Sequence, residues 1–248
     1  MEVGSEVAIP RYGVDALGRH NYSQESESGL PKSYAELISQ KVKGRVGKTE
    51  GIFLDVGGGT GELSKYIANG LRVKSVVLDY SPVGLAGNRL EGAVADARHL
   101  PIADREVGVL HTKDMVEHLD DAGLASFISE ASRVLKADGT LIITEKDYYP
   151  GFPFFQKPHV IVESDGKTGH EDFKPGESYA EAVSRIKSNL GDSTRVGVPY
   201  YPRSRSQLVQ LMEKSGFVYE DAEKWQTKKG EPDWFKGLPR NVMSFKLK

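Results

Sequence analysis

A cluster of glycines between an apolar run and a possible helix constrains this chain most. The apolar run covers residues 52–56, the glycines lie at 57–61, and a helix-compatible segment follows at 62–69. Glycine has no Cβ, so such a turn can adopt positive φ angles and let backbone approach a ligand closely. The order strand, tight turn and helix predicts a doubly wound α/β sheet with a ligand site at the turn.

The spacing of these glycines indicates which ligand the turn suits. The following helix would present free N–H groups and a positive dipole end, which suit a phosphate or an amino-acid carboxylate. A dinucleotide turn reads Gly-x-Gly-x-x-Gly, whereas the glycines here alternate as Gly57-x-Gly59-x-Gly61. Asp55, inside the strand, would lie badly near a pyrophosphate but well near a cationic amino group. The alternative, a glycine turn without a ligand, is disfavoured by the strand and helix around it.

A second acid stands at the end of the next predicted strand. This strand covers residues 73–80 and is apolar up to Asp79. Asp79 lies about twenty residues after the glycine turn, where an acid usually meets ribose hydroxyls in doubly wound sheets. A carboxylate can accept two hydrogen bonds from a vicinal diol, so its chemistry fits this role. The alternative is an exposed acid at a strand end.

These motifs together carry a family resemblance. The pattern Asp-x-Gly-x-Gly-x-Gly at 55–61 resembles the first motif of class I S-adenosylmethionine-dependent methyltransferases, and the chain looks like the type 11 methyltransferase domain. Asp96 follows the third predicted strand and precedes a Leu-Pro pair, which resembles the adenine-contacting segment of that family. The resemblance covers residues 52–144, with weaker agreement from 206 onwards.

The resemblance implies an enzyme that binds S-adenosylmethionine. Asp55 would act near the methionine ammonium, Asp79 on the ribose and Asp96 on the adenine amino group. The backbone N–H of Ala97 could reach a ring nitrogen. The residues expected to contact the cofactor are Asp55, Gly57, Gly58, Gly59, Thr60, Gly61, Asp79, Tyr80, Asp96, Ala97 and Lys113.

The segment after the fourth strand, residues 113–121, resembles the part of the family that lines the methionine half and the substrate pocket. Asp114 and His118 are therefore the candidate catalytic bases. For His118, the alternative is a structural role in fixing the following turn. The expected reaction is in-line displacement of a methyl group from the sulfonium. Alignment and exclusion of water would contribute several kcal/mol to it.

The remaining pattern predicts an α/β fold: a doubly wound, seven-stranded, mostly parallel Rossmann-like methyltransferase sheet with an insertion after the fifth strand. Alternation of strands and helices implies parallel pairing, and the resemblance implies an antiparallel final strand. The expected strands are 52–56, 73–80, 92–96, 107–112, 140–144, 217–225 and 241–247, and the expected helices are 33–42, 62–69, 121–136, 178–190 and 206–215, with another starting at Pro82.

Two segments lie outside the alternating pattern. Residues 1–30 are polar and rich in glycine and serine, which is typical of a disordered tail or of a mobile arm that closes over a pocket. Residues 146–203 carry prolines and aromatics and are expected to form a cap over the acceptor, the alternatives being a packing subdomain or an oligomer contact. The methyltransferase domain would then span 31–248. The expected acceptor contacts are Tyr22, Lys146 and Tyr148, with His159, His170, Tyr200 and Tyr201 as further candidates.

Composition excludes several classes of function. The chain has 248 residues, a net charge of -2 and no cysteine, so disulfides, thiolate nucleophiles and cysteine-bound zinc are ruled out. The histidines are dispersed and no metal-binding motif appears. Neither a signal peptide nor a membrane-spanning run is seen. We expect a cytoplasmic enzyme without a membrane partner; its oligomeric state is not predicted.

The favoured acceptor is a small molecule. A tRNA or protein acceptor is the alternative, supported by basic stretches at 41–45 and 224–229. Nucleic acid is disfavoured because the charge is not basic overall and the Asn-Pro-Pro-Tyr type of tetrapeptide is absent. A protein that binds the cofactor without turnover is a third reading. A nicotinamide dehydrogenase is disfavoured by the glycine spacing and Asp55.

Overall fold

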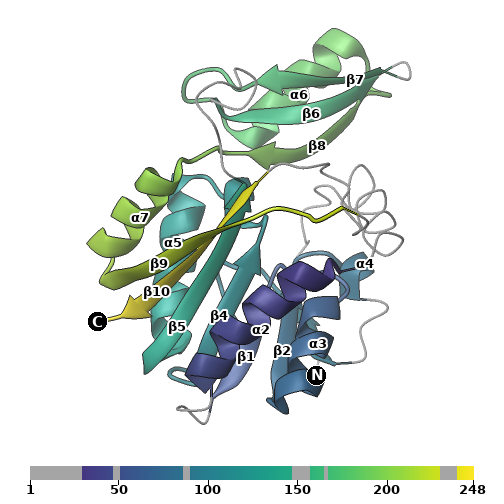
Figure 1. Cartoon of the computed structure of the whole chain (residues 1–248). Coiled ribbons are helices and arrows are strands. Elements are labelled where there is room, and N and C mark those ends of the chain that lie inside the picture. The colour runs from purple at the N-terminus through teal and green to yellow at the C-terminus, as the bar shows by residue number, and fades with distance from the viewer. Residues whose placement is uncertain (1–29, 47–50, 86–89, 147–156, 165–166, 230–238) are drawn as a thin grey trace, which may run out of the picture.

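The computed structural model describes residues 30–46, 51–85, 90–146, 157–164, 167–229 and 239–248 (Figure 1). Its main body is a seven-stranded sheet in the order β3-β2-β1-β4-β5-β10-β9. Only the two pairs that include β10 are antiparallel. The predicted doubly wound sheet with its antiparallel final strand is thus confirmed. The strands are β1 (Ile52–Val56), β2 (Ser75–Asp79), β3 (Glu91–Val94), β4 (Val107–Lys113), β5 (Leu135–Lys146), β9 (Phe217–Trp225) and β10 (Arg240–Leu247).

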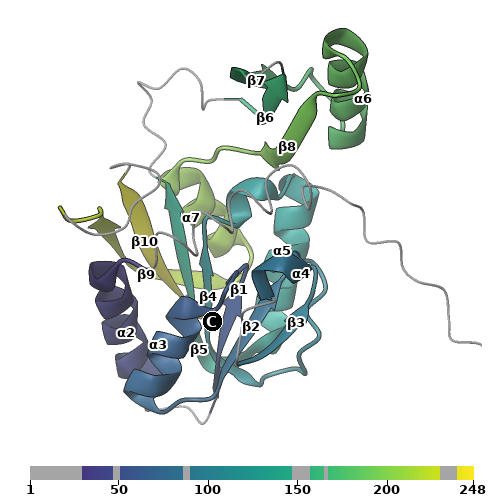
Figure 2. The same ribbon diagram turned by 90° about the vertical axis from the view of Figure 1, so that its right-hand side faces the viewer.

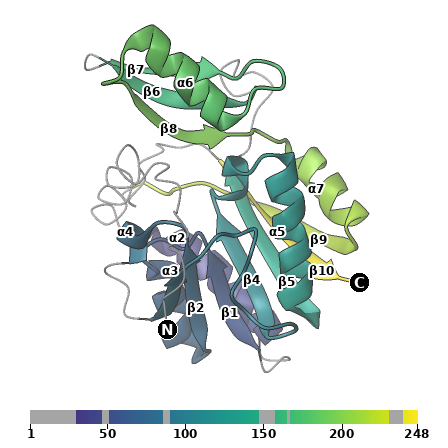
Figure 3. The ribbon, with the colours of Figure 1, turned by 180° about the vertical axis from the view of Figure 1, so that it is seen from behind.

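Helices cover both faces of this sheet (Figures 2 and 3). Side chains alternate between the faces along each strand. Phe53 accordingly packs in one core with α2 and α3, while its neighbour Leu54 packs in the other core with α5 and α7. The helices of the main body are α2 (Lys32–Val46), α3 (Glu62–Leu71), the short α4 (Pro82–Leu85), α5 (Asp121–Val134) and α7 (Arg205–Lys214).

Helix α5 shows how the sequence sets these boundaries. The Asp120 side chain caps its start by accepting a hydrogen bond from the backbone N–H of Gly123 at 2.7 Å. Its apolar stripe is buried, as the helical spacing predicts. The helix ends at Val134, two residues before the predicted end, because Leu135 turns to an extended conformation and pairs with Val107 of β4.

A second sheet follows β5 and forms, with one helix, a unit that we call the cap. Its strands are antiparallel, in the order β7-β6-β8. Helix α6 begins with a capping box between Ser178 and Glu181 and buries Ile186 against β6 and β8. In Figure 1 the cap stands at one end of the main sheet. Its elements are β6 (His159–Ser164), β7 (Lys167–Asp172), α6 (Tyr179–Leu190) and β8 (Arg195–Tyr200).

Across the described ranges, every helix is too short or too polar to cross a membrane. The predicted arm at 1–30 falls almost entirely outside those ranges, as do Tyr22 and Tyr148, two of the predicted acceptor contacts.

Candidate functional site

The glycine turn adopts the backbone conformation that its sequence predicts. Gly57, Gly59 and Gly61 have φ angles of 74°, 53° and 71°, in the left-handed region that favours glycine. The backbone N–H of Gly57 donates to the carbonyl of Leu78 at 2.7 Å, which ties the turn to β2. Gly61 is the N-cap of α3 and provides no side-chain cap. The turn therefore presents backbone, with Thr60 half-buried within it, at the carboxyl end of β1.

Asp55 lies beneath this turn. Its side chain is 3% exposed, and its carboxylate accepts hydrogen bonds from the Ser64 hydroxyl at 2.9 Å and from Nδ1–H of His111 at 2.8 Å. A Cβ added to Gly58 would stand 2.8 Å from the Oδ2 atom of Asp55. The Asp55 carboxylate therefore packs against the backbone of the turn. Because the carboxylate is buried, little of its surface is open to the cofactor contact predicted for it.

Asp79 ends β2 beside the turn, as predicted. Its Oδ2 atom accepts a hydrogen bond from the backbone N–H of Gly59 at 2.9 Å, and its Oδ1 atom accepts one from the N–H of Ser81 at 2.8 Å. Tyr80, the next residue, is half-buried. Each carboxylate oxygen has a second lone pair, so Asp79 can hold the turn and still accept hydroxyl donors.

Asp96 lies two residues beyond the end of β3 and is paired with Arg98. The guanidinium Nε of Arg98 donates to both carboxylate oxygens, at 2.9 and 3.0 Å, and its backbone N–H donates at 2.9 Å. Partial burial raises the pKa of Asp96, but the hydrogen bonds and charge of Arg98 outweigh it and leave the pKa below the ordinary value. Asp96 is therefore an ionised acceptor, with the half-buried Ala97 beside it. The sequence analysis did not anticipate Arg98.

Asp114 follows β4 directly and is held by a residue from the far end of the chain. Arg240 of β10 donates from Nε to both of its carboxylate oxygens at 3.1 Å. Burial raises the pKa of Asp114, but the charges of Arg240 and of two lysines outweigh it, and the pKa lies well below the ordinary value. One of these lysines, Lys113, has its ammonium 3.7 Å from Asp114 and 5.5 Å from the ring centroid of Tyr34. An acid with so low a pKa is a weak base.

His118 ends the short 3-10 helix η2 (Val116–His118) and contacts the cap. Its Nδ1–H donates to the carbonyl of Pro199 in β8 at 2.8 Å, and its ring lies edge-on to Tyr200 with centroids 4.7 Å apart. Burial lowers the pKa of His118 below its ordinary value of 6.5, although the nearby Glu117 charge opposes this shift. With Nδ1 carrying the proton, the neutral ring has its basic lone pair on Nε2.

A buried group of charges links η2 to the end of β5. The ammonium of Lys146 donates a hydrogen bond to Glu117, and both side chains are at most 8% exposed. Glu145 accepts from the backbone N–H of Val116 at 3.2 Å, and burial together with neighbouring carboxylates raises its pKa well above the ordinary value. Lys146 also lies 5.5 Å from the ring centroid of Tyr200. Its ammonium is paired within the protein, and its predicted contact with the acceptor stays a prediction.

The cap completes this end of the sheet with a short stack of rings. His159 of β6 lies parallel to Tyr200, with centroids 5.3 Å apart and planes inclined by 7°. The backbone N–H of Tyr201 donates to the carbonyl of Glu117 at 2.6 Å. The carboxyl ends of β4 and β5, η2 and the end of β8 therefore meet in one place. Residues that the sequence analysis missed here are Glu117, Glu145, Arg240, Tyr34 and His111, whose partners lie far away in the chain.

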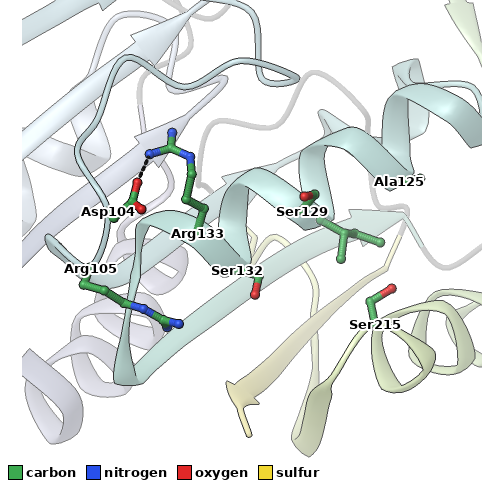
Figure 4. A pocket seen from close by; sticks show the side chains of 8 residues that line it. Asp104, Arg105, Ala125, Ser129, Ser132, Arg133 and Ser215 are labelled. Carbon is green, nitrogen blue, oxygen red and sulfur yellow. Dashed lines mark hydrogen bonds and ion pairs between the residues drawn. The ribbon is translucent and has the colours of Figure 1, made fainter.

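A separate hollow of about 440 Å³ lies away from this place (Figure 4). It is bordered by the outer side of α5 and by Asp104 and Arg105, which precede β4. An ion pair of 2.7 Å between Asp104 and Arg133 crosses its rim. Asp104 and Arg105 lie at the amino end of β4, whereas the glycine turn lies at the carboxyl end of β1. The hollow and the turn are therefore at opposite ends of the parallel strands.

Comparison with known proteins agrees with this geometry. Residues 54–143 match the family model described as methyltransferase domain. A search of curated proteins finds no match. Among solved structures, an S-adenosylmethionine-dependent methyltransferase from Clostridium acetobutylicum aligns with a TM-score of 0.61 at 14% identity, over 93% of this chain and 97% of its own.

Two further structures carry bound ligands. The 1,6-didemethyltoxoflavin-N1-methyltransferase of Burkholderia thailandensis, with bound 1,6-didemethyltoxoflavin and S-adenosylhomocysteine, aligns with a TM-score of 0.57 at 13% identity, over 99% of this chain and 94% of its own. The geranyl diphosphate C-methyltransferase of Streptomyces coelicolor aligns with a TM-score of 0.52 at 12% identity, over 86% and 79%. At these identities the structural likeness shows the fold, and the family match shows the domain. Residues 54–143 therefore form a methyltransferase domain, and the chain as a whole has the fold of these enzymes.

Proposed function

We propose that this enzyme methylates a small-molecule acceptor bound between the carboxyl edge of the seven-stranded sheet and the cap. The observation that carries this proposal is the hydrogen-bonded contact of the end of β8 with η2. Pro199 accepts a hydrogen bond from His118, and Tyr201 donates one to Glu117. The cap therefore meets the segment that follows β4, at the same edge as the glycine turn. Ligands of doubly wound sheets bind outside the carboxyl ends of the strands.

The residues at the turn fit the cofactor. The turn of left-handed glycines lets a ligand approach closely, and the start of α3, which has no side-chain cap, offers backbone donors to the methionine carboxylate. Asp79 would accept from the ribose hydroxyls, and Asp96 with Ala97 would hold the adenine. Lys113 would border the methionine half. S-adenosylmethionine supplies, when bound, a methyl group on a good leaving group.

We assign proton removal to His118 rather than to Asp114. Asp114 is ion-paired with Arg240 and has a strongly lowered pKa, so it takes up a proton poorly at neutral pH. His118 is neutral at that pH, and its bond to the Pro199 carbonyl leaves Nε2, 3.8 Å from the Glu117 carboxylate, as the basic nitrogen. Its Nε2 atom would accept the proton of an acidic hydroxyl or N–H group as the methyl group is transferred. An acceptor that is already nucleophilic needs only the alignment and the exclusion of water.

The basic stretch at 41–45 gives little support to a tRNA acceptor. Lys41 pairs with Asp221 and Glu223 at 2.8 Å, and Arg45 pairs with Glu220 at 3.0 Å. These two charges are therefore satisfied by β9, and Lys43 is the exposed cation of the stretch. The two ligand-bound methyltransferases described above, with 1,6-didemethyltoxoflavin and with geranyl diphosphate, also favour a small acceptor.

Two measurements test the proposal. Calorimetry should detect binding of S-adenosylhomocysteine and none of the nicotinamide dinucleotide. Incubation with isotopically labelled S-adenosylmethionine and separated cell fractions should then label the small-molecule fraction. Label confined to RNA or to protein would refute the acceptor class. Binding without turnover in any fraction would favour the non-catalytic reading.

A further inference from the structure

A chain of hydrogen-bonded buried side chains, which we call the relay, runs beneath the glycine turn and reaches helix α2. Its members are Ser64, Asp55, His111, Tyr34 and Thr144. Asp55 accepts from Ser64 at 2.9 Å and from His111 Nδ1–H at 2.8 Å. The His111 Nε2 atom is hydrogen-bonded at 2.8 Å to the Tyr34 hydroxyl, which also bonds the Thr144 hydroxyl at 2.9 Å. All five residues are at most 3% exposed. Each side chain is therefore a buried hydrogen-bonding partner of the next.

Sheet register and helix packing bring these residues together. Asp55 of β1 lies directly opposite His111 of β4. Tyr34 lies in the first turn of α2, and Ile38 and Val42 of the same helix are buried in the core on this face. The relay thus joins three strands to a helix that precedes the methyltransferase motif in the chain.

The relay ends at the backbone of the turn. A Cβ on Gly58 would meet the Asp55 carboxylate at 2.8 Å, so this carboxylate fills the space directly below the turn. Ser64, its other partner, lies in the first turn of α3. Within the described ranges, neither a lysine nor an arginine pairs with Asp55, whose only ion-pair partner there is His111. The position of this carboxylate therefore depends on hydrogen bonds from His111 and Ser64.

We propose that Tyr34 and His111 are positioning residues for the cofactor-binding turn. They hold Asp55 against Gly58 and so make helix α2 part of the cofactor site, although neither residue touches the ligand. This inference rests on the proposed function, because it requires the cofactor to bind at the turn. Burial raises the pKa of Tyr34, so its hydroxyl keeps its proton and remains a hydrogen-bonding group at neutral pH.

The test compares two hydroxyl deletions that both loosen α2. Tyr34→Phe removes the relay contact, whereas Ser33→Ala removes the other buried contact of the same turn, the hydrogen bond of 3.0 Å from Trp225 Nε1 to Ser33. Calorimetry with S-adenosylhomocysteine should show about tenfold weaker binding for Tyr34→Phe, equivalent to about 1.4 kcal/mol. Ser33→Ala should lower the melting temperature and leave the affinity unchanged.

Substitutions of His111 separate positioning from general stability. Asparagine places a donor near the position of Nδ1, and glutamine places one near Nε2. His111→Asn keeps a donor for Asp55 but loses the contact with Tyr34, so it should weaken binding about tenfold, as Tyr34→Phe does; His111→Gln leaves Asp55 without this donor and should weaken binding further. If Tyr34→Phe does not fold, Thr144→Val interrupts the same relay at its other end and gives the same readout.

Two outcomes would overturn the positioning role. One is unchanged affinity in Tyr34→Phe or Thr144→Val. The other is a loss of affinity that merely tracks the fall in melting temperature, so that Ser33→Ala weakens binding as much as Tyr34→Phe does. Failure of the unmodified protein to bind S-adenosylhomocysteine would instead overturn the proposed function, and the positioning role with it.

Discussion

Replacing Lys146 with methionine tests whether this residue stabilises the fold or serves the acceptor. The substitution keeps an unbranched side chain and removes the charge. It leaves the Glu117 carboxylate, whose side chain is 1% exposed, without the ammonium that donates to it. Glu145 and Asp114 already crowd this place with acidic groups. Glu117 would therefore remain a buried charge that has lost its ammonium partner.

The expected loss of stability is large. Removing one partner of a buried ion pair costs about 3–5 kcal/mol, because the remaining charge stays desolvated. The contact of the ammonium with the Tyr200 ring, at 5.5 Å, is lost as well and would add up to about 1 kcal/mol. For a chain of this length, the loss corresponds to a fall in melting temperature of roughly 10 °C.

Urea unfolding followed by circular dichroism measures this loss directly. Lys113→Met is the matched control, because Lys113 ends the neighbouring strand β4 but is 24% exposed and 3.7 Å from Asp114. Such a pair should contribute no more than about 1 kcal/mol. The double variant Lys146→Met with Glu117→Gln should recover most of the lost stability, because no buried charge is left unpaired. A Lys146→Met protein within about 1 kcal/mol of the original, or a double variant without recovery, would refute the reasoning.

Three other outcomes are expected. Gly59→Val places a β-branched residue at a φ of 53° and should weaken S-adenosylhomocysteine binding more than about 100-fold by calorimetry, while Gly70→Ala, whose added Cβ meets nothing within 4 Å, should not. The pKa of His118 is lowered from 6.5, so the rate of methyl transfer should stay constant near neutral pH and fall only below pH 6.5, as His118 becomes protonated. Rate measurements across pH should show this fall, and His118→Gln should abolish it. The pKa of Glu145 is raised above 4.5, so its contribution to stability is present below pH 4.5 and is lost as pH rises. Glu145→Gln should therefore be more stable than the original protein between about pH 5 and 8, and melting curves at several pH values would show this.

The candidate cofactor residues could be located from the sequence because they lie in local segments in chain order. Each strand brings its own candidate residue to the carboxyl end of the sheet, so that Asp79 and Asp96 are located once the strands are recognised. The positive φ angles of the turn also follow from glycine alone. Helix ends were predicted less closely. Val134 ends α5 because the next residue pairs with β4, and a helical pattern contains no information about that pairing.

The state of each acid could not be predicted in the same way, because its partners lie elsewhere in the chain. Asp55 and Asp114 are both acids at or near strand ends, yet one is held by an imidazole and a hydroxyl and the other by a guanidinium. The pair of Asp114 and Arg240 spans 126 residues, and that of His118 and Pro199 spans 81. Periodicity reports which face of an element is buried, but not which element packs on that face.

The fold changes which of the two candidate bases, Asp114 or His118, is favoured. In the sequence, Asp114 and His118 are both candidate bases, four residues apart, and a structural role is the favoured alternative for His118. In the fold, β10 delivers a cation to Asp114 and lowers its pKa, while β8 delivers a carbonyl oxygen to His118 and leaves Nε2 as the basic atom. Both β8 and β10 lie beyond the matched family segment at 54–143. The family match therefore covers the methyltransferase domain, whereas the residues that set the protonation of Asp114 and His118 come from parts of the chain that lie outside it.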